Sequence, residues 1–319
     1  MIWTPLNKAI ESNNTFLISS HLSLDGDCVG SQLAFLWYLK NIGKKAECFC
    51  FDPLPQKFAF LENSGLIRTE LPKEKFDVLM ILDCSSVSRL GWDVENSGIG
   101  TIINIDHHRD NTNFGSGELN FVDPAAAAAG EIIFSFFNEC NINFPPAVAE
   151  ALYTAILTDT GGFRFSNTNS NVLNVCAQLA GKGADCAGIY DKVYSSHTPQ
   201  ALVLQSRIWS SLTFYFDGKI CCMDMPMSIL KEIGAQYSDS EGMADNTITA
   251  IGAQVGIMTK HTNEETHFSL RSRGKVDVGR VAQKIPGGGG HCCAAGCTIK
   301  LPYKEAMEQM LAILAKELE

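Results

Sequence analysis

The clearest pattern along the chain is a series of short apolar segments that each run directly into polar residues. Four of these segments are predicted to be buried strands because they are rich in β-branched and other apolar side chains; they cover residues 15–20, 46–51, 76–82 and 99–105. A helical pattern follows the first strand at 31–41, and an apolar helix is predicted at 146–157. Strands that alternate with helices in this way predict an α/β fold with a mostly parallel sheet and flanking helices.

Three of these strands, and the apolar helix, end in side chains that bind metals or move protons. The residues in question are His21, Asp25 and Asp27, then Asp83, then Asp106, His107 and His108, and finally Asp159. Because the carboxyl ends of parallel strands meet at one edge of a sheet, we expect these side chains to converge there. Taken singly, the Asp25-Gly26-Asp27 stretch is an ordinary turn or helix cap, and Asp159 an ordinary helix end. Three such strand ends in one sheet favour a site.

The donor types narrow the choice of metal. Two imidazoles and four carboxylates offer borderline nitrogen and hard oxygen without thiolate, a set that suits Mn²⁺ or Mg²⁺ better than structural Zn²⁺. The six residues are His21, Asp25, Asp27, Asp83, His107 and Asp159. Six ligands, with one bridging, are enough for two ions, and two ions about 4 Å apart stabilise the attacking and leaving oxygens of a phosphoryl displacement. The pattern therefore indicates a phosphoesterase.

The second half of the chain predicts a smaller domain with a mixed sheet. The expected strands cover residues 212–216, 219–223, 248–258 and 267–271, with a helix near residue 228 and further helices over 276–284 and 303–318. We expect a catalytic domain over 1–184, a helical linker over 185–211 and a substrate-binding domain over 212–319.

Residues 286–296, with the sequence PGGGGHCCAAG, stand out in this half. Four successive glycines lose much conformational freedom on folding, so a merely structural loop has little use for them. Their amides could form an anion-binding nest beside His291, with charge from Arg271 and Arg273 on the preceding strand. A flexible hinge is the simpler alternative.

Composition excludes several classes of protein. The net charge of −10 argues against a protein coated in basic surface for long duplex DNA, although a short anion could still be bound locally. The 12 cysteines are scattered without a Cys-x-x-Cys pair, which indicates reduced thiols. The start of the chain lacks the features of a signal peptide, and no apolar run is long enough for a membrane span. We therefore expect a cytoplasmic protein.

The ordered motifs also resemble those of a known family. The pattern His21-x3-Asp25-x-Asp27, followed by Asp83, by Asp106-His107-His108 and by Asp159, is similar to the four motifs of the DHH phosphoesterase family. The sequence GGGGHCCAAG resembles the signature of the DHH-associated C-terminal domain. The match spans nearly the whole chain, and the compact two-domain form is similar to the nanoRNase and pAp phosphatase (NrnA-like) branch.

That resemblance implies a division of labour among the residues, across an active-site cleft between the two domains. It implies that His21, Asp25 and Asp83 hold one Mn²⁺ and that Asp27, Asp83, His107 and Asp159 hold a second, with Mg²⁺ as the alternative metal. Asp83 would bridge the ions, Asp106 would brace the histidines, and His108 would orient or protonate the scissile phosphate. The residues expected to bind substrate are Arg109, Arg271, Arg273, Gly288, Gly289, Gly290 and His291.

The activity implied is Mn²⁺-dependent hydrolysis of short single-stranded oligoribonucleotides to mononucleotides, and of 3′-phosphoadenosine 5′-phosphate to AMP, by attack of a metal-bridged hydroxide on phosphorus. Three alternatives stay open. The same centre could cleave cyclic dinucleotides or the linear products pApA and pGpG, the N-terminal motifs are shared with manganese pyrophosphatases, and a regulator could bind nucleotides without catalysis. A homodimer is an arrangement that the sequence leaves open.

Overall fold

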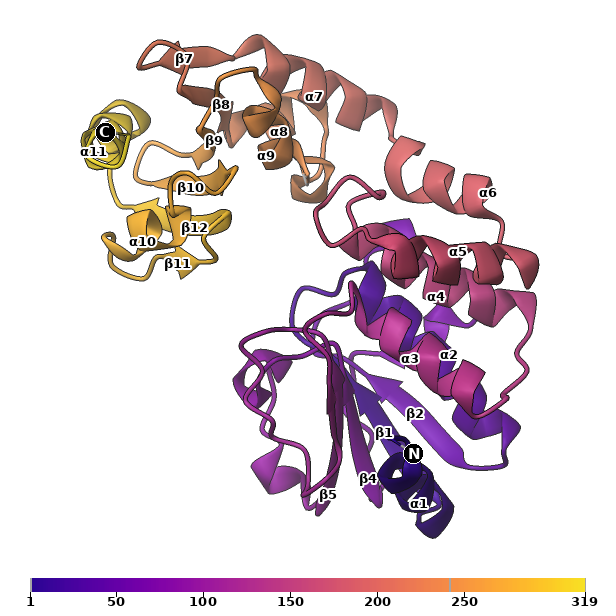
Figure 1. Cartoon of the computed structure of the whole chain (residues 1–319). Coiled ribbons are helices and arrows are strands. Elements are labelled where there is room, and N and C mark those ends of the chain that lie inside the picture. The colour runs from indigo at the N-terminus through magenta and orange to yellow at the C-terminus, as the bar shows by residue number, and fades with distance from the viewer. Residues whose placement is uncertain (1, 241, 319) are drawn as a thin grey trace. The chain divides into compact units, whose positions relative to one another are not determined.

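The computed structural model describes residues 2–240 and 242–318. The chain divides into two compact units, residues 1–196 and residues 197–319 (Figure 1). Each unit has its own six-stranded sheet. None of the helices in the described part of the chain combines the length and the apolar character that crossing a bilayer requires.

The sheet of the N-terminal unit is entirely parallel. Its strands are β1 (Thr15–Ser19), β2 (Lys45–Phe49), β3 (Ile67–Arg68), β4 (Val78–Leu82), β5 (Thr101–Asp106) and β6 (Asn120–Val122). They pair in the order β3-β2-β1-β4-β5-β6. From the central pair β1 and β4 the strand order runs in opposite directions, so the carboxyl ends of these two strands form a topological switch point, where open α/β sheets bind ligands.

Helices cover one face of this sheet. They are α1 (Thr4–Ser12), α2 (Gly26–Asn41), α3 (Ala129–Glu139), α4 (Pro146–Asp159), α5 (Ser170–Gly181) and α6 (Cys186–Tyr190), and Figure 1 shows α2 to α5 gathered on one side of the strands. Alternate strand residues such as Ile18 and Met80 pack against the helices. Their neighbours Leu17 and Ile81 face the other way, under the irregular segment around Leu90 and Trp92. The predicted parallel α/β fold is confirmed.

Helix α2 begins at Gly26, five residues before the start predicted from the sequence. Asp25 caps it, because its carboxylate accepts a hydrogen bond from the Cys28 amide at 2.9 Å. Close packing on α4 also explains Gly30, since a Cβ there would lie 2.2 Å from the Ala151 carbonyl oxygen. The early start places Asp27 in the first turn of the helix, where its side chain is fully buried.

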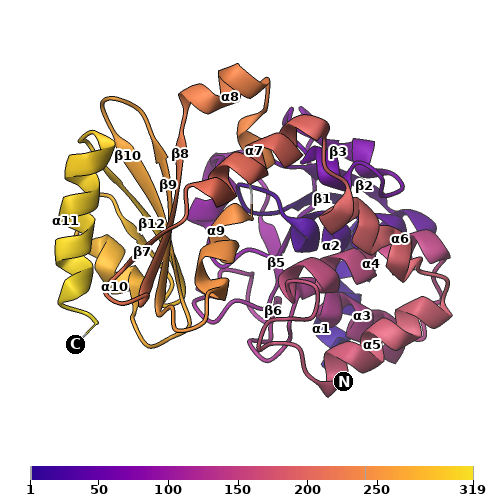
Figure 2. The ribbon, with the colours of Figure 1, turned by 90° about the horizontal axis from the view of Figure 1, so that it is seen from above.

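The C-terminal unit contains a mixed sheet between two layers of helices. Its elements are α7 (Pro199–Ser210), β7 (Thr213–Tyr215), β8 (Ile220–Pro226), α8 (Ser228–Ile233), α9 (Met243–Asn246), β9 (Val255–His261), β10 (Thr266–Ser272), α10 (Val278–Gln283), β11 (Gly289–Gly290), β12 (Ala294–Ile299) and α11 (Tyr303–Ala315). The strand order is β11-β12-β10-β9-β8-β7. Among the described strands of this sheet, β8 and β9 pair in parallel and the other neighbours pair antiparallel. Figure 2 shows α10 and α11 on one face of the sheet and α7 to α9 on the other. The predicted mixed sheet is confirmed.

One predicted strand was too long. Residues 248–258 were expected to be a continuous strand, but β9 begins only at Val255, and Thr247–Thr249 is a single 3₁₀ turn. The turn packs back onto β9, where Gly256 has no side chain and leaves room for Thr247; a Cβ there would lie 2.0 Å from the Thr247 hydroxyl oxygen. The β-branched residues of this segment therefore serve close packing, which outweighs their strand propensity.

Candidate metal centre

Eight of the predicted site residues come together at the carboxyl end of the parallel sheet. They come from five elements of the chain, and they are His21 after β1, Asp25 and Asp27 at the start of α2, Asp83 after β4, Asp106, His107 and His108 at the end of β5, and Asp159 at the end of α4. Arg109 follows the histidine pair on an exposed turn. The cluster thus forms at the switch point, as the sequence predicted.

Within this cluster the possible ligand atoms form overlapping groups. One group consists of His21, Asp25, Cys28 and Asp83, and another of Asp27, His107 and Asp159; within each group the ligand atoms lie within 4.8 Å of one another. Asp83 also belongs to a further group, which contains Asp106, His107 and His108. Asp83 is therefore shared between the two sides of the cluster.

The Asp83 carboxylate occupies the centre of the cluster. Its Oδ2 lies 3.5 Å from His21 Nε2, and its Oδ1 lies 3.4 Å from His107 Nε2. Asp83 is 1% exposed, and its Oδ1 is buried without a hydrogen-bond partner among the described residues. Its backbone has a φ of +52°, in the left-handed region that is uncommon for non-glycine residues but that Asp tolerates better than most. A buried carboxylate oxygen with no hydrogen bond is an atom that a cation would satisfy.

The Asp27 carboxylate is held by the beginning of α3. Its Oδ2 accepts a hydrogen bond from the Ala129 amide at 2.5 Å, and its Oδ1 accepts one from the Gly130 amide at 2.9 Å. The Ser31 hydroxyl donates to the same Oδ1 at 2.9 Å. These donors fix the orientation of a fully buried carboxylate.

Two of the three imidazoles are oriented by hydrogen bonds on Nδ1. His21 Nδ1 lies 2.5 Å from the Leu22 carbonyl oxygen, which can only accept, so Nδ1 carries the proton and Nε2 faces the carboxylates. His108 Nδ1 pairs with Asp106 Oδ1 at 2.7 Å, while the Asn111 amide donates to Asp106 Oδ2 at 2.5 Å. Such hydrogen bonds select the tautomer of a metal-binding or proton-transferring histidine.

Burial and mutual repulsion shift the pKa values of the clustered groups. Burial, followed by repulsion from Asp83 and Asp159, raises the pKa of Asp25 to about 6 and that of Asp27 well above its usual range. Burial opposes a charge on His107, but the Asp159 and Asp83 carboxylates, whose oxygens lie 3.1 and 3.4 Å from its Nε2, outweigh this and raise its pKa to about 12. A divalent cation would relieve the repulsion among the carboxylates, so the residues fit metal ions bound through oxygen and nitrogen.

The sequence analysis missed one member of the cluster. The Cys28 thiol is buried, and its Sγ lies 3.2 Å from Asp83 Oδ2 and 2.8 Å from the Ser20 hydroxyl. Burial, followed by the negative charges of Asp25 and Asp83, raises the pKa of Cys28 well above its usual range, so the thiol donates to Asp83. The cluster therefore contains a protonated thiol beside the predicted residues. The sequence could have indicated Cys28 by its position in the first turn of α2, three residues after Asp25, which caps the helix.

The remaining predicted site residues belong to the C-terminal unit. Arg271 Nε donates to Asp245 Oδ1 at 2.6 Å, whereas the Arg273 and His291 side chains are exposed. Of the four glycines, Gly288 is required by packing, because a Cβ there would lie 2.2 Å from the Ala282 carbonyl oxygen. The Gly288 and His291 amides already donate to the Ile285 and Ala294 carbonyls. These two amides are thus already used within the protein.

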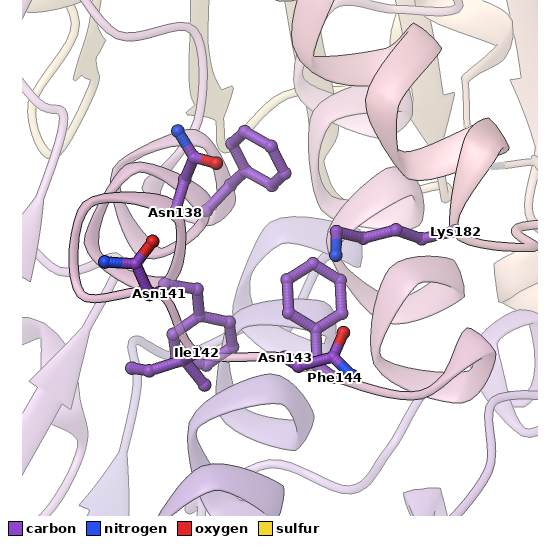
Figure 3. A pocket seen from close by; sticks show the side chains of 8 residues that line it. Asn138, Asn141, Ile142, Asn143, Phe144 and Lys182 are labelled. Atoms are coloured by element: carbon purple, nitrogen blue, oxygen red, sulfur yellow. The ribbon is translucent and has the colours of Figure 1, made fainter.

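A pocket of about 200 Å³ lies elsewhere in the N-terminal unit, at the C-terminal end of α3 (Figure 3). Its walls are Phe134, Phe137, Asn138, Asn141, Ile142, Asn143, Phe144 and Lys182. The Lys182 ammonium lies 4.5 Å from the centre of the Phe144 ring. The lining contains neither carboxylate nor imidazole, and the possible ligand groups found among the described residues all lie at the switch point.

Comparisons with known proteins agree with this geometry. Residues 15–156 match the N-terminal domain of the DHH family, and residues 219–319 match the DHHA1 domain. The chain is 34% identical, over 98% of its length and 92% of the relative's, to the bifunctional oligoribonuclease and PAP phosphatase NrnA of Thermus thermophilus. The chain belongs to the DHH family. The resemblance recognised from the motifs, including that to the NrnA-like branch, is confirmed.

Solved structures of DHH relatives share the fold. The crystal structure of an exopolyphosphatase-related protein from Bacteroides fragilis has a TM-score of 0.88 at 25% identity and covers 99% of this DHH chain and 96% of its own. RecJ of Thermus thermophilus in complex with Mn²⁺ has a TM-score of 0.52 at 13% identity and covers 99% of this chain and 54% of its own. At that identity the likeness to RecJ concerns the fold alone.

Proposed function

We propose that this chain is a two-metal phosphoesterase that hydrolyses short oligoribonucleotides to mononucleotides and 3′-phosphoadenosine 5′-phosphate to AMP. The observation that carries the proposal is the buried Asp83 carboxylate shared between two ligand groups at the switch point. The Thermus thermophilus relative named as an oligoribonuclease and PAP phosphatase, which matches almost the full chain, supports the choice of substrates.

The proposed roles are those that the resemblance to the DHH family implies, and the positions of the side chains support them. His21, Asp25 and Asp83 would hold one divalent cation, and Asp27, Asp83, His107 and Asp159 the other. When bound, the pair would supply Lewis acidity and an activated water near neutral pH. His108, whose Nδ1 pairs with Asp106 at 2.7 Å, is proposed to give a proton to the leaving oxygen through its other nitrogen.

The metal is proposed to be Mn²⁺, with Mg²⁺ as the alternative. Carboxylates suit both ions, but two imidazoles in the ligand set favour the softer Mn²⁺. The thiol of Cys28 keeps its proton in the described cluster and donates it to Asp83, so it adds no thiolate that would select Zn²⁺.

The C-terminal unit is proposed to bind the far end of the substrate. His291 and Arg273 are exposed and offer hydrogen-bond donors, Arg273 carries a positive charge, and Gly289 and Gly290 form a short strand without side-chain bulk. Arg109 is proposed to bind a phosphate near the metals. Local basic groups of this kind allow a protein of net charge −10 to bind a short anion.

A substrate panel tests the proposal. Product formation with Mn²⁺ is measured for a 5′-phosphorylated RNA dinucleotide, an RNA five-mer, 3′-phosphoadenosine 5′-phosphate, cyclic and linear signalling dinucleotides, and pyrophosphate. We expect the RNA dinucleotide and the bisphosphate to be turned over fastest. Turnover of only the cyclic dinucleotides or of pApA and pGpG would replace the proposal with a role in second-messenger breakdown.

Two further outcomes would contradict the proposed hydrolysis of nucleotides itself. Rapid hydrolysis of pyrophosphate alone would indicate a pyrophosphatase. Nucleotide binding without Mn²⁺ and without hydrolysis of any compound would indicate a regulator. The matched control in each assay is Asp110→Asn, which changes an exposed carboxylate close to the histidine pair and should leave turnover unchanged.

A further inference from the structure

Two adjacent cysteines lie at the tip of the glycine-rich hairpin. Cys292 and Cys293 are both exposed, whereas the other cysteines are buried or half-buried. Their Sγ atoms lie 3.5 Å apart. They occupy the central positions of a turn in which the His291 amide donates to the Ala294 carbonyl at 2.8 Å and the Ala294 amide donates back at 3.3 Å. The chain thus presents a pair of neighbouring thiols to solvent directly beside His291.

The backbone of this turn is tied to two other elements. The Cys292 carbonyl accepts a hydrogen bond from the Val278 amide, the first residue of α10, at 3.0 Å. The Cys293 carbonyl accepts one from the Ser272 amide, the last residue of β10, at 2.9 Å. The conformation of the two cysteines therefore determines how the turn that carries His291 is held.

We propose that Cys292 and Cys293 form a reversible modification site, at which a low-molecular-weight disulfide converts the two thiols into a disulfide between adjacent residues. The thiolate of one cysteine attacks a sulfur of the small disulfide, forms a mixed disulfide and releases one small thiolate. The neighbouring thiol loses its proton and attacks the cysteine sulfur of the mixed disulfide, which releases the second small thiolate. Overall, two protein thiols and one small disulfide become one protein disulfide and two small thiols.

Closure of this ring must change the turn. The Sγ atoms have to move from 3.5 Å to about 2.05 Å, the length of a disulfide bond. Adjacent Cα atoms are about 3.8 Å apart, below the usual range for disulfides, so the backbone between the cysteines has to twist. The Cys292 carbonyl, which accepts from Val278, belongs to the peptide between the two cysteines, and the Cys293 carbonyl, which accepts from Ser272, belongs to the next peptide. We therefore expect oxidation to break these hydrogen bonds and to displace His291, and strain in the ring to make the disulfide easy to reduce.

The modification is tested on the full chain by mass. The reduced protein is treated with excess oxidised glutathione, and its intact mass and the peptide containing residues 292 and 293 are measured. We expect this peptide to lose two hydrogens and to regain them with dithiothreitol. Cys292→Ser and Cys293→Ser each remove one partner, so each should instead gain one glutathione. A wild-type peptide that keeps a glutathione, or that remains unmodified, would overturn the proposal.

The displacement of the turn is tested without any assay of activity. Hydrogen exchange at the Val278 and Ser272 amides should become faster on oxidation, and should stay slow in a Cys292→Ser, Cys293→Ser double variant under the same treatment. Unchanged exchange in the oxidised wild type would show that ring closure leaves the turn in place.

The effect on substrate rests on the proposed function. The KM for the RNA dinucleotide should rise about tenfold on oxidation, roughly the cost of one misplaced hydrogen bond, with unchanged kcat and metal content. Reductant should restore it, and the double variant should not respond. If the ring forms and the turn moves while no dinucleotide is hydrolysed in either state, the proposed function fails and the modification site stands. An unchanged KM in an active, oxidised enzyme would reject the link to substrate binding.

Discussion

In the N-terminal unit the candidate site consists of buried and half-buried side chains that contact one another at the ends of strands and helices, whereas in the C-terminal unit His291 and Arg273 lie exposed on a turn and just after a strand. Asp27 illustrates the first case, with three donors on a carboxylate that is fully buried. His291 illustrates the second, because its backbone is hydrogen-bonded within the turn while its side chain is exposed.

This difference bears on what each region can do. A cluster of carboxylates that is oriented by hydrogen bonds concentrates negative charge, so it can bind cations and stabilise the charge that develops during a reaction. An exposed histidine on a glycine-rich turn can contact a ligand but cannot by itself exclude water. We therefore expect substitutions in the first region to reduce kcat and metal binding, and substitutions in the second to raise KM.

The largest effect is expected at Asp83. Asp83→Asn keeps a residue type that tolerates a positive φ but removes the charge shared by the two ligand groups. We expect kcat to fall by about a thousandfold or more, since several kcal/mol of charge stabilisation are lost. Added Mn²⁺ should raise the Tm of the wild type and not that of the variant. Metal content near the wild-type value in Asp83→Asn would contradict the assignment of this region as the metal centre.

A smaller loss is expected at Asp106, which acts through His108. Asp106→Asn cannot accept from both the His108 ring and the Asn111 amide, so the orientation of the ring is weakened. We expect kcat to fall by about 10- to 100-fold. We also expect a shift in the part of the plot of kcat against pH that reflects the protonation of His108. Measurement of kcat against pH, with Asp110→Asn as the control, separates this from a general loss of folding. An unchanged pH profile would mean that Asp106 serves only the fold.

In the C-terminal unit, His291→Ala sharpens the comparison. We expect KM for the RNA dinucleotide to rise about tenfold with unchanged kcat and metal content, because one contact to the substrate is lost. The control is His197→Ala, which removes another exposed histidine of the same unit. Steady-state kinetics is measured on both variants. If His291→Ala and His197→Ala have equal KM values, His291 is not a substrate-binding residue.

The smallest effect separates packing from binding within the glycine run. Gly288→Ala should lower the free energy of unfolding by about 1–3 kcal/mol, because the new Cβ meets the Ala282 carbonyl oxygen. Gly289→Ala meets nothing within 4 Å and should stay within about 0.5 kcal/mol of the wild type. Thermal unfolding measures both. A rise in KM for Gly289→Ala at unchanged stability would indicate that substrate lies against this residue.

Local sequence was sufficient to predict the parallel sheet and the convergence of eight site residues. Apolar segments such as 76–82 specify buried strands, and three of the four are followed by a side chain of the site, as Asp83 follows β4. Because parallel strands align their carboxyl ends, the order of these segments along the chain already implies that the side chains meet. No knowledge of distant contacts is needed for this step.

Only the tertiary structure decided the features that depend on contacts between distant segments. Helix α2 starts at Gly26 and packs closely on α4 at Gly30, which brings the Cys28 thiol to Asp83. Strand β9 is shortened because Thr247 packs against Gly256. The pairing of Asp27 with the start of α3 joins residues about a hundred positions apart. Such contacts depend on how whole elements pack, and the local pattern of apolar and polar residues carries no record of them.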